Sequence, residues 1–147
     1  MIQERITIGE LSKRTGCKIP TIRYYENVGL ITTPQRSEGN TRIYNEQHIQ
    51  QLHFIQHCRE LGFDQSAIKE LLDLTGQPEY SCDQATEISK RHLDDINQKV
   101  ARLQAMKSEL EHMIISCSGG KVADCQLLEI LADHTHGHCL EPNHSRV

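Results

Sequence analysis

The 147-residue chain is 37% apolar with no tryptophan, so it can build one modest aliphatic core or a small head with an extended element. No apolar run approaches the roughly 20 residues that span a bilayer, and no secretory signal opens the sequence, so we expect a full-length cytoplasmic protein and exclude a membrane protein. The net charge is −4, but residues 1–44 carry seven basic against four acidic side chains, and such a basic head suits DNA binding.

The first two predicted elements are short helices joined by a turn. Apolar spacing over residues 6–14 predicts the first helix, and Thr15, Gly16 and Cys17 form the turn. Pro20 suits the first position of the second helix, which stops at Gly29. Two short helices around a glycine-containing turn are typical of a helix-turn-helix unit.

Residues 31–44 are predicted to form a short hairpin, or wing. Pro34, Gly39 and Asn40 exclude a helix, and residues 41–44 are strand-like. Asn45 and Asp64 are then suited to cap two further helices, which end near residues 61–62 and 76–78.

Residues 83–116 contain neither glycine nor proline and predict one long helix. Its apolar positions follow an alternating spacing of three and four residues, which is typical of a coiled-coil seam, with one polar member. We infer that the seam pairs with a second copy of the chain; folding back onto the N-terminal helices is the alternative. The seam consists of Leu93, Ile96, Val100, Leu103, Lys107, Leu110 and Ile114.

Beyond the long helix, Gly119 and Gly120 break the chain, and residues 124–132 predict a short helix with Leu127, Leu128 and Leu131 on one side. The last residues read as a flexible tail. The expected domains are a DNA-binding head with linker helices (1–78), a dimerisation helix (79–117), a metal-binding loop with a short helix (118–133) and a histidine-rich tail (134–147).

Six cysteines and nine histidines are many for a cytosolic chain of this length. A reducing compartment does not support a disulfide framework, so metal binding or redox chemistry becomes the leading interpretation. Cys17 and Cys58 fall inside amphipathic patterns and are expected in the core. The tail offers a second, weaker metal site or only a mildly chelating end; its candidate ligands are His134, His136, His138, Cys139 and His144.

Three other cysteines flank the predicted elements. Cys82 and Cys117 lie 35 residues apart at the two ends of the long helix, roughly 50 Å at about 1.5 Å per residue, so they cannot share an ion within one chain. Antiparallel helices in a dimer would bring Cys82 of one chain beside Cys117 of the other. Cys125 follows Cys117 by eight residues and can meet it locally. We therefore predict two symmetric three-thiolate sites for soft or borderline ions, with ordinary buried cysteines as the alternative.

The head resembles the MerR family of transcription regulators. The resemblance covers residues 6–131 and implies an all-α fold with a small β wing: a winged helix-turn-helix head and a long antiparallel coiled-coil dimerisation helix. It implies a non-enzymatic regulator that binds double-stranded promoter DNA as a homodimer and acts with RNA polymerase. The motifs are Ile8-Gly9-Glu10-Leu11, Thr21-Ile22-Arg23-Tyr24-Tyr25-Glu26, Gly29-Leu30, Arg36 through Asn40, Arg42, Tyr44, Phe54-Ile55, Cys58-Arg59 and Leu61-Gly62-Phe63.

Several residues of these motifs are expected to bind DNA. Arg23 lies in the first turns of the recognition helix, where it can reach a phosphate or a guanine edge. Other arginines and tyrosines offer donors to backbone phosphates, although core packing is the alternative for the tyrosines. We expect one of Tyr24 and Tyr25 to be buried and the other to face DNA. The predicted set is Thr21, Arg23, Tyr24, Tyr25, Arg36, Asn40, Arg42 and Tyr44.

Within the family the chain looks most like the cadmium, lead and zinc sensors. The zinc sensors have a second cysteine and a histidine in the loop, whereas here Ser118 follows Cys117 and residues 118–124 contain no histidine. The resemblance therefore favours Cd²⁺ or Pb²⁺ as the bound ion, with Zn²⁺ as an alternative. It also implies that metal binding distorts the bound promoter and converts repression into activation of a detoxification gene.

Two other functions stay open. A cytosolic metal buffer would need the cysteines but not the basic head, so DNA binding separates it from a regulator. A thiol redox switch would use Cys117 and Cys125 as a disulfide pair. Comparing thiol-blocked with metal-chelated protein separates that switch from a metal sensor.

Overall fold

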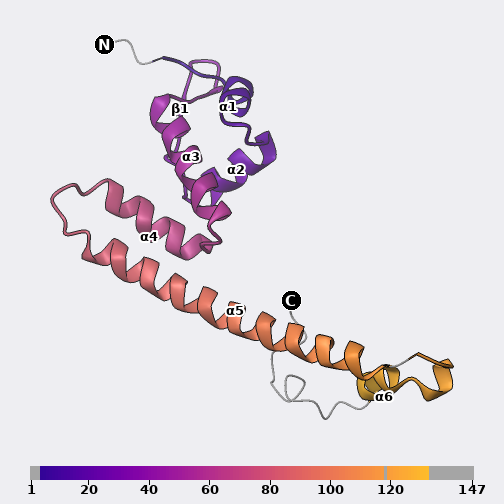
Figure 1. Cartoon of the computed structure of the whole chain (residues 1–147). Helices are drawn as coiled ribbons and strands as arrows, with labels where there is room; N and C mark the ends of the chain where they lie inside the picture. Colours follow the sequence, from indigo (N-terminus) through magenta and orange to yellow (C-terminus); the bar gives the residue numbers. More distant parts are fainter. Residues whose placement is uncertain (1–3, 118, 133–147) are drawn as a thin grey trace. The chain divides into compact units, whose positions relative to one another are not determined.

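A computed structural model describes residues 4–117 and 119–132 of the chain (Figure 1). The described part is mostly helical with one two-stranded sheet, as the sequence predicts. It divides into two units, Met1–Ser89 and Lys90–Val147, which are treated separately below. None of the described helices combines the length and apolar character needed to cross a membrane.

The first unit contains two short helices, a small hairpin and two further helices. Gly16 ends α1 in the left-handed conformation with φ of 71°, which a glycine adopts without strain and which turns the chain toward α2. Asp64 caps α4 by accepting a hydrogen bond from the Ala67 amide at 2.8 Å. The elements are α1 Ile8–Thr15, α2 Ile19–Asn27, β1 Gln35–Arg36, β2 Arg42–Ile43, α3 Glu46–Glu60 and α4 Gln65–Thr75.

The first helix begins two residues later than the sequence pattern predicts. Thr7 is its N-cap, and the Thr7 hydroxyl accepts a hydrogen bond from the Glu10 amide at 3.3 Å. The backbone of Ile6 instead pairs with that of Tyr44 through two hydrogen bonds of 2.9 and 2.8 Å. Ile6 therefore ties the start of the chain to the hairpin rather than opening the helix.

The core of the first unit is aliphatic, as its composition requires. Cys17 and Cys58 are both buried in it, so the prediction that they are core residues is confirmed. Burial raises the pKa of both thiols, which keeps them in the neutral form that packs in an apolar environment. The buried cluster consists of Ile6, Leu11, Cys17, Ile22, Leu30, Ile31, Tyr44, Ile49, Leu52, Ile55, Cys58 and Ile68.

The long helix α5 Asp83–Ser116 begins in the first unit and continues through the second as one uninterrupted helix (Figure 1). The six apolar side chains of its seam are each between 37% and 62% exposed in the single chain. An exposed apolar seam of this length, with Lys107 as its one polar member, needs a partner to cover it.

After α5 the chain forms the 3₁₀ turn Val122–Asp124 and the short helix α6 Gln126–Ala132. This helix starts two residues later than predicted, because Asp124 belongs to the 3₁₀ turn. Leu127 is half-buried, whereas Leu128 and Leu131 are 47% and 46% exposed. The three leucines predicted to share one side therefore differ in their surroundings.

Candidate DNA-binding surface and metal centre

The recognition helix α2 presents a mixed surface. Arg23 is exposed, Thr21 is half-buried, and Tyr24 is 50% exposed. Tyr25 is half-buried and packs against the core, so of the two tyrosines Tyr24 is the one at the surface. The Tyr24 hydroxyl donates a hydrogen bond of 2.8 Å to the Gln65 side-chain carbonyl, which links α2 to the start of α4.

The wing brings two predicted DNA-binding residues together at its tip. Strands β1 and β2 are antiparallel, with Arg36 opposite Arg42. The Arg36 guanidinium donates to the backbone carbonyl and to the side-chain oxygen of Asn40, at 3.1 and 3.2 Å. Asn40 has φ of 63°, in the left-handed region that asparagine tolerates better than most residues. Both side chains are exposed, so the wing tip can reach a phosphate backbone.

Arg42 and Tyr44 converge on one carboxylate. The Nε of Arg42 donates to Oε1 of Glu26 at 3.0 Å, and the Tyr44 hydroxyl donates to Oε2 of the same residue at 3.2 Å. The hydrogen bond to Glu26 is the main cause that raises the pKa of Arg42. Burial, with the Glu26 charge as a second cause, raises the pKa of Tyr44 to about 12.

For Tyr44 these contacts favour the alternative interpretation, core packing, over donation to a DNA phosphate. Its relative exposure is 0%, and the described contact of its hydroxyl is with Glu26. Tyr44 is a core residue that supports the wing. Glu26, which sequence reasoning missed as a participant, is the acceptor that joins the wing to α2; the only sequence signal for it was its place in the motif after Tyr25.

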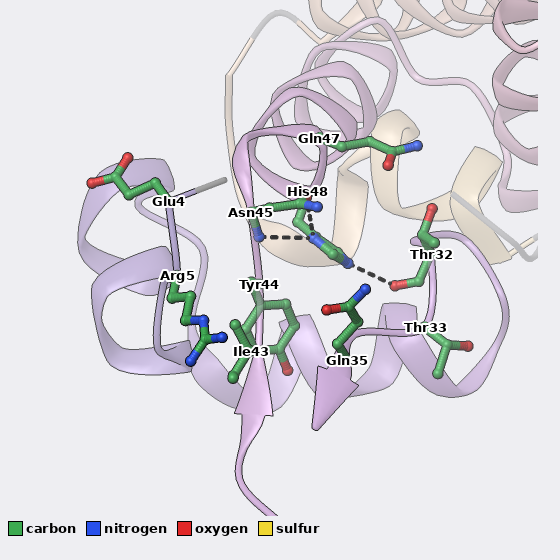
Figure 2. A pocket seen from close by; sticks show the side chains of 10 residues that line it. All are labelled: Glu4, Arg5, Thr32, Thr33, Gln35, Ile43, Tyr44, Asn45, Gln47 and His48. Atoms are coloured by element: carbon green, nitrogen blue, oxygen red, sulfur yellow. Dashed lines mark hydrogen bonds between the residues drawn. The ribbon is translucent and has the colours of Figure 1, made fainter. Parts of the chain in front are cut away.

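A cavity lies beside the wing, and Figure 2 shows its lining side chains. His48 stands in it between Asn45 and Thr32. Its Nδ1 accepts from the Asn45 backbone amide at 3.1 Å and lies 2.8 Å from Asn45 Oδ1, and its Nε2 donates to the Thr32 carbonyl at 2.9 Å. The bonds to the Asn45 amide and to the Thr32 carbonyl fit the neutral tautomer with its proton on Nε2. Burial is the main cause that lowers the pKa of His48. His48 is engaged by Asn45 and Thr32, and Glu4 pairs with Arg14, so we assign the cavity no ligand.

The two loop cysteines predicted to meet do lie together. The Sγ atoms of Cys117 and Cys125 are 3.8 Å apart. Cys125 directly precedes α6, and hydrogen bonds from the backbone amides of Leu128 and, more weakly, Leu127 lower the pKa of its thiol. Two thiolates bound to one tetrahedral ion at about 2.3 Å are also roughly 3.8 Å apart, so the pair fits a shared metal ion.

The third candidate ligand is exposed at the other end of α5. Cys82 precedes the first residue of that helix, and its backbone carbonyl accepts from the amide and hydroxyl of Thr86. Over residues 4–117 and 119–132, no three histidine, cysteine or acidic side chains gather closely enough to hold one ion. Among the described residues, the structure thus brings Cys117 and Cys125 together as a pair of thiols, and Cys82 belongs to the other unit. The tail residues His134, His136, His138, Cys139 and His144 lie outside the described residues.

Comparisons with known proteins agree on one family. The model of the MerR helix-turn-helix regulatory proteins matches residues 6–75, and the model of the MerR DNA-binding region matches residues 49–113. The heavy metal-dependent transcription regulator 2 of Rhizobium meliloti is 34% identical over 128 residues, which are 87% of each chain. The regulator ZntR of Escherichia coli is 35% identical over 133 residues, covering 88% of this chain and 94% of ZntR.

A solved structure extends the likeness to three dimensions. The transcription regulator PbrR691 of Ralstonia metallidurans, in complex with lead(II), superposes with a TM-score of 0.78 at 36% identity, over 86% of this chain and 98% of that one. MerR-family proteins are regulators that bind DNA as dimers and are not enzymes, as predicted for this chain. On its sequence, its fold and these matches, the chain belongs to the MerR family of helix-turn-helix regulatory proteins.

Proposed function

We propose that the protein is a metal-responsive transcription activator that senses a soft divalent ion, with Cd²⁺ and Pb²⁺ favoured over Zn²⁺. One observation carries the proposal: the Sγ atoms of Cys117 and Cys125 lie 3.8 Å apart and form a thiol pair. A further cysteine, Cys82, precedes the other end of the 34-residue helix α5. Support also comes from relatives described as heavy metal-dependent or solved with lead(II).

The head is proposed to bind promoter DNA in the cytoplasm, where RNA polymerase also acts. Arg23 on α2 contacts a base edge or a phosphate in the major groove, with Thr21 and Tyr24 beside it. Arg36 and Arg42 of the wing bind backbone phosphates. Asn40 orients Arg36 at the wing tip, and Tyr25, which packs against the core, is proposed to contact DNA with its hydroxyl. The basic excess in residues 1–44 supplies long-range attraction to the duplex.

Each metal site is proposed to use two chains. Cys117 and Cys125 of one chain would hold the ion together with Cys82 of a second, antiparallel chain, which gives two sites per dimer by symmetry. When bound, the ion supplies bonds between thiolates that belong to different chains. Joining the two ends of the paired α5 helices in this way fixes the relative setting of the two heads, and the promoter bends and untwists to follow them.

The donor set favours the softer ions. Three thiolates leave a tetrahedral zinc ion one ligand short, and residues 119–124 offer no histidine and one carboxylate, Asp124. The histidine-rich tail could add a second, weaker site.

Transcription across a metal panel tests the proposal. A promoter bound by the protein is transcribed in vitro with zinc, cadmium, lead, mercury and copper at matched free-ion activity. We expect cadmium or lead to induce most strongly and Cys125→Ser to abolish the response. Strongest induction by zinc would contradict the metal assignment, and no induction by any of these ions would contradict metal sensing.

A thiol redox switch is the second candidate, because the same Cys117 and Cys125 pair could form a disulfide. Oxidant treatment of metal-free protein separates the two functions. A redox switch changes transcription without metal, whereas a metal sensor under the same treatment loses its response to metal.

A further inference from the structure

Glu26 carries a negative charge in the recognition helix α2, and its side chain is bound by residues of the wing. A carboxylate on the DNA-facing side of a recognition helix repels phosphates, so its presence there costs affinity. Glu26 nevertheless lies in the recognition helix, three residues after Arg23. Its side chain is only 13% exposed, so the carboxylate faces the protein rather than solvent.

The partners of Glu26 come from the wing. Arg42 and Tyr44 are two residues apart along an extended strand, so their side chains point to the same face, toward α2. Each takes a different carboxylate oxygen, Arg42 at 3.0 Å and Tyr44 at 3.2 Å. One side chain therefore bridges α2 and the wing.

Tyr44 makes this bridge rigid. Its ring is fully buried, its backbone pairs with Ile6, and the ring meets His48 edge-on at a centroid distance of 5.2 Å. Arg42, in contrast, is 35% exposed, and its described contact with Glu26 uses Nε. Among the described residues this leaves the two Nη groups of Arg42 to bind a phosphate. A guanidinium whose Nε is held in this way is oriented before DNA arrives.

We propose that Glu26 is a positioning residue for DNA binding: its carboxylate fixes the wing to the recognition helix and aims Arg42 at the duplex. The proposal rests on the DNA-binding role of the head. It predicts that removing a negative charge from the interface weakens specific binding, which is the opposite of the simple electrostatic expectation.

The experiment uses full-length protein and a duplex selected from a randomised pool by the wild type. Glu26→Gln keeps the shape and removes the charge, and Glu38→Gln, on the exposed wing turn, is the matched control for loss of a negative charge. We expect Glu26→Gln to bind the selected duplex about tenfold or more weakly, while its affinity for an unrelated duplex stays equal or increases. Glu38→Gln should bind both duplexes equally or more tightly. A variant that was merely misfolded would lose both activities.

A double-mutant cycle tests whether Glu26 acts through Arg42. Arg42→Lys keeps the charge but loses the Nε contact, so adding Glu26→Gln to it should weaken specific binding little further. Tyr44→Phe, which keeps the buried ring, should shift specificity in the same direction by a smaller factor and decides the matter if Glu26→Gln does not fold. Tight specific binding by Glu26→Gln, or fully additive losses, would overturn the proposal. A wild type that selects no duplex would instead contradict DNA binding itself.

Discussion

Single polar side chains hold the head together at points where its backbone has no regular partner. His48 is 3% exposed and bridges the Asn45 amide and the Thr32 carbonyl (Figure 2). The bond from the Asn45 amide needs the neutral imidazole, because Nδ1 accepts it and a protonated Nδ1 cannot, whereas Nε2 donates to the Thr32 carbonyl in either state. The packing of the wing against α3 therefore depends on the protonation state of one histidine.

This dependence predicts a loss of stability in mild acid. Burial lowers the pKa of His48 below its ordinary value of 6.5, so the unfolded chain takes up the proton first as the pH falls. The stabilisation is complete above about pH 6.5 and declines below it, by at most about 1.4 kcal/mol per pH unit for one proton. Denaturant melts from pH 7.5 to 5 should show this slope in the wild type and in His53→Gln, an exposed control on the same helix. The slope should be reduced in His48→Gln, and an unchanged slope in that variant would contradict the assignment.

The cysteines divide into buried core residues and proposed metal ligands, and substitution should affect stability in the first group and metal binding in the second. Cys58→Ser places a hydroxyl in the apolar core and should lower the free energy of unfolding by about 1–3 kcal/mol while metal binding stays intact. Cys125→Ser should leave the melt of the metal-free protein nearly unchanged. It should weaken Cd²⁺ binding by more than the roughly 10–100-fold that an outer-shell change costs. Calorimetric titration and melts of both variants check this; loss of metal binding in Cys58→Ser would contradict the grouping.

At the scale of elements, the seam of α5 contains one polar position. Lys107 interrupts the apolar spacing, and its described ion pair with Glu111, at 3.8 Å between side chains 76% and 60% exposed, is a solvated surface contact. A polar seam residue lowers dimer stability while fixing the register of the two helices.

Lys107→Leu should therefore strengthen the dimer. Burying a leucine contributes about 1.5–3 kcal/mol per side chain, which predicts a dissociation constant at least about tenfold lower. Gln98→Leu, on the opposite side of α5, adds the same apolar group away from the seam and should have little effect. Sedimentation equilibrium measures both variants. Equal constants for the two would mean that the predicted seam does not form the interface.

The helices and their contacts also show which features could be predicted from the sequence and which could not. The predicted limits of α5, residues 83 and 116, agree with the structure. The stretch without glycine or proline is longer, residues 79–118, so it predicts a long helix here without fixing the residues at which the helix ends. The apolar pattern places the start of α1 at Ile6, because Ile6 continues that pattern. The helix starts later because Thr7 is the residue that caps its N-terminus. The role of Glu26 depends on a contact between residues 16 apart, and only the folded wing brings Arg42 to it. Local patterns predict helices well, whereas side-chain partners across the fold are set by tertiary packing.

At the scale of the whole molecule, the proposed metal site is one that a single chain would not complete alone. Within a chain, the loop offers two thiols, and Cys82 precedes the first residue of the 34-residue helix that ends just before Cys117. A dimer of antiparallel helices, as proposed, would bring Cys82 of one chain to the loop of the other and would cover the exposed seam.

Metal titration of a mixed dimer tests this most directly. Chains carrying Cys82→Ser and Cys117→Ser are co-expressed with different affinity tags, and the heterodimer is purified through both. One of its sites then lacks two ligands, while the other regains intact Cys82, Cys117 and Cys125. We predict that the heterodimer binds one Cd²⁺ with near wild-type affinity, whereas neither parental homodimer does. If each site belonged to one chain, every heterodimer site would still lack a ligand, so the absence of a recovered high-affinity site would contradict the shared metal centre.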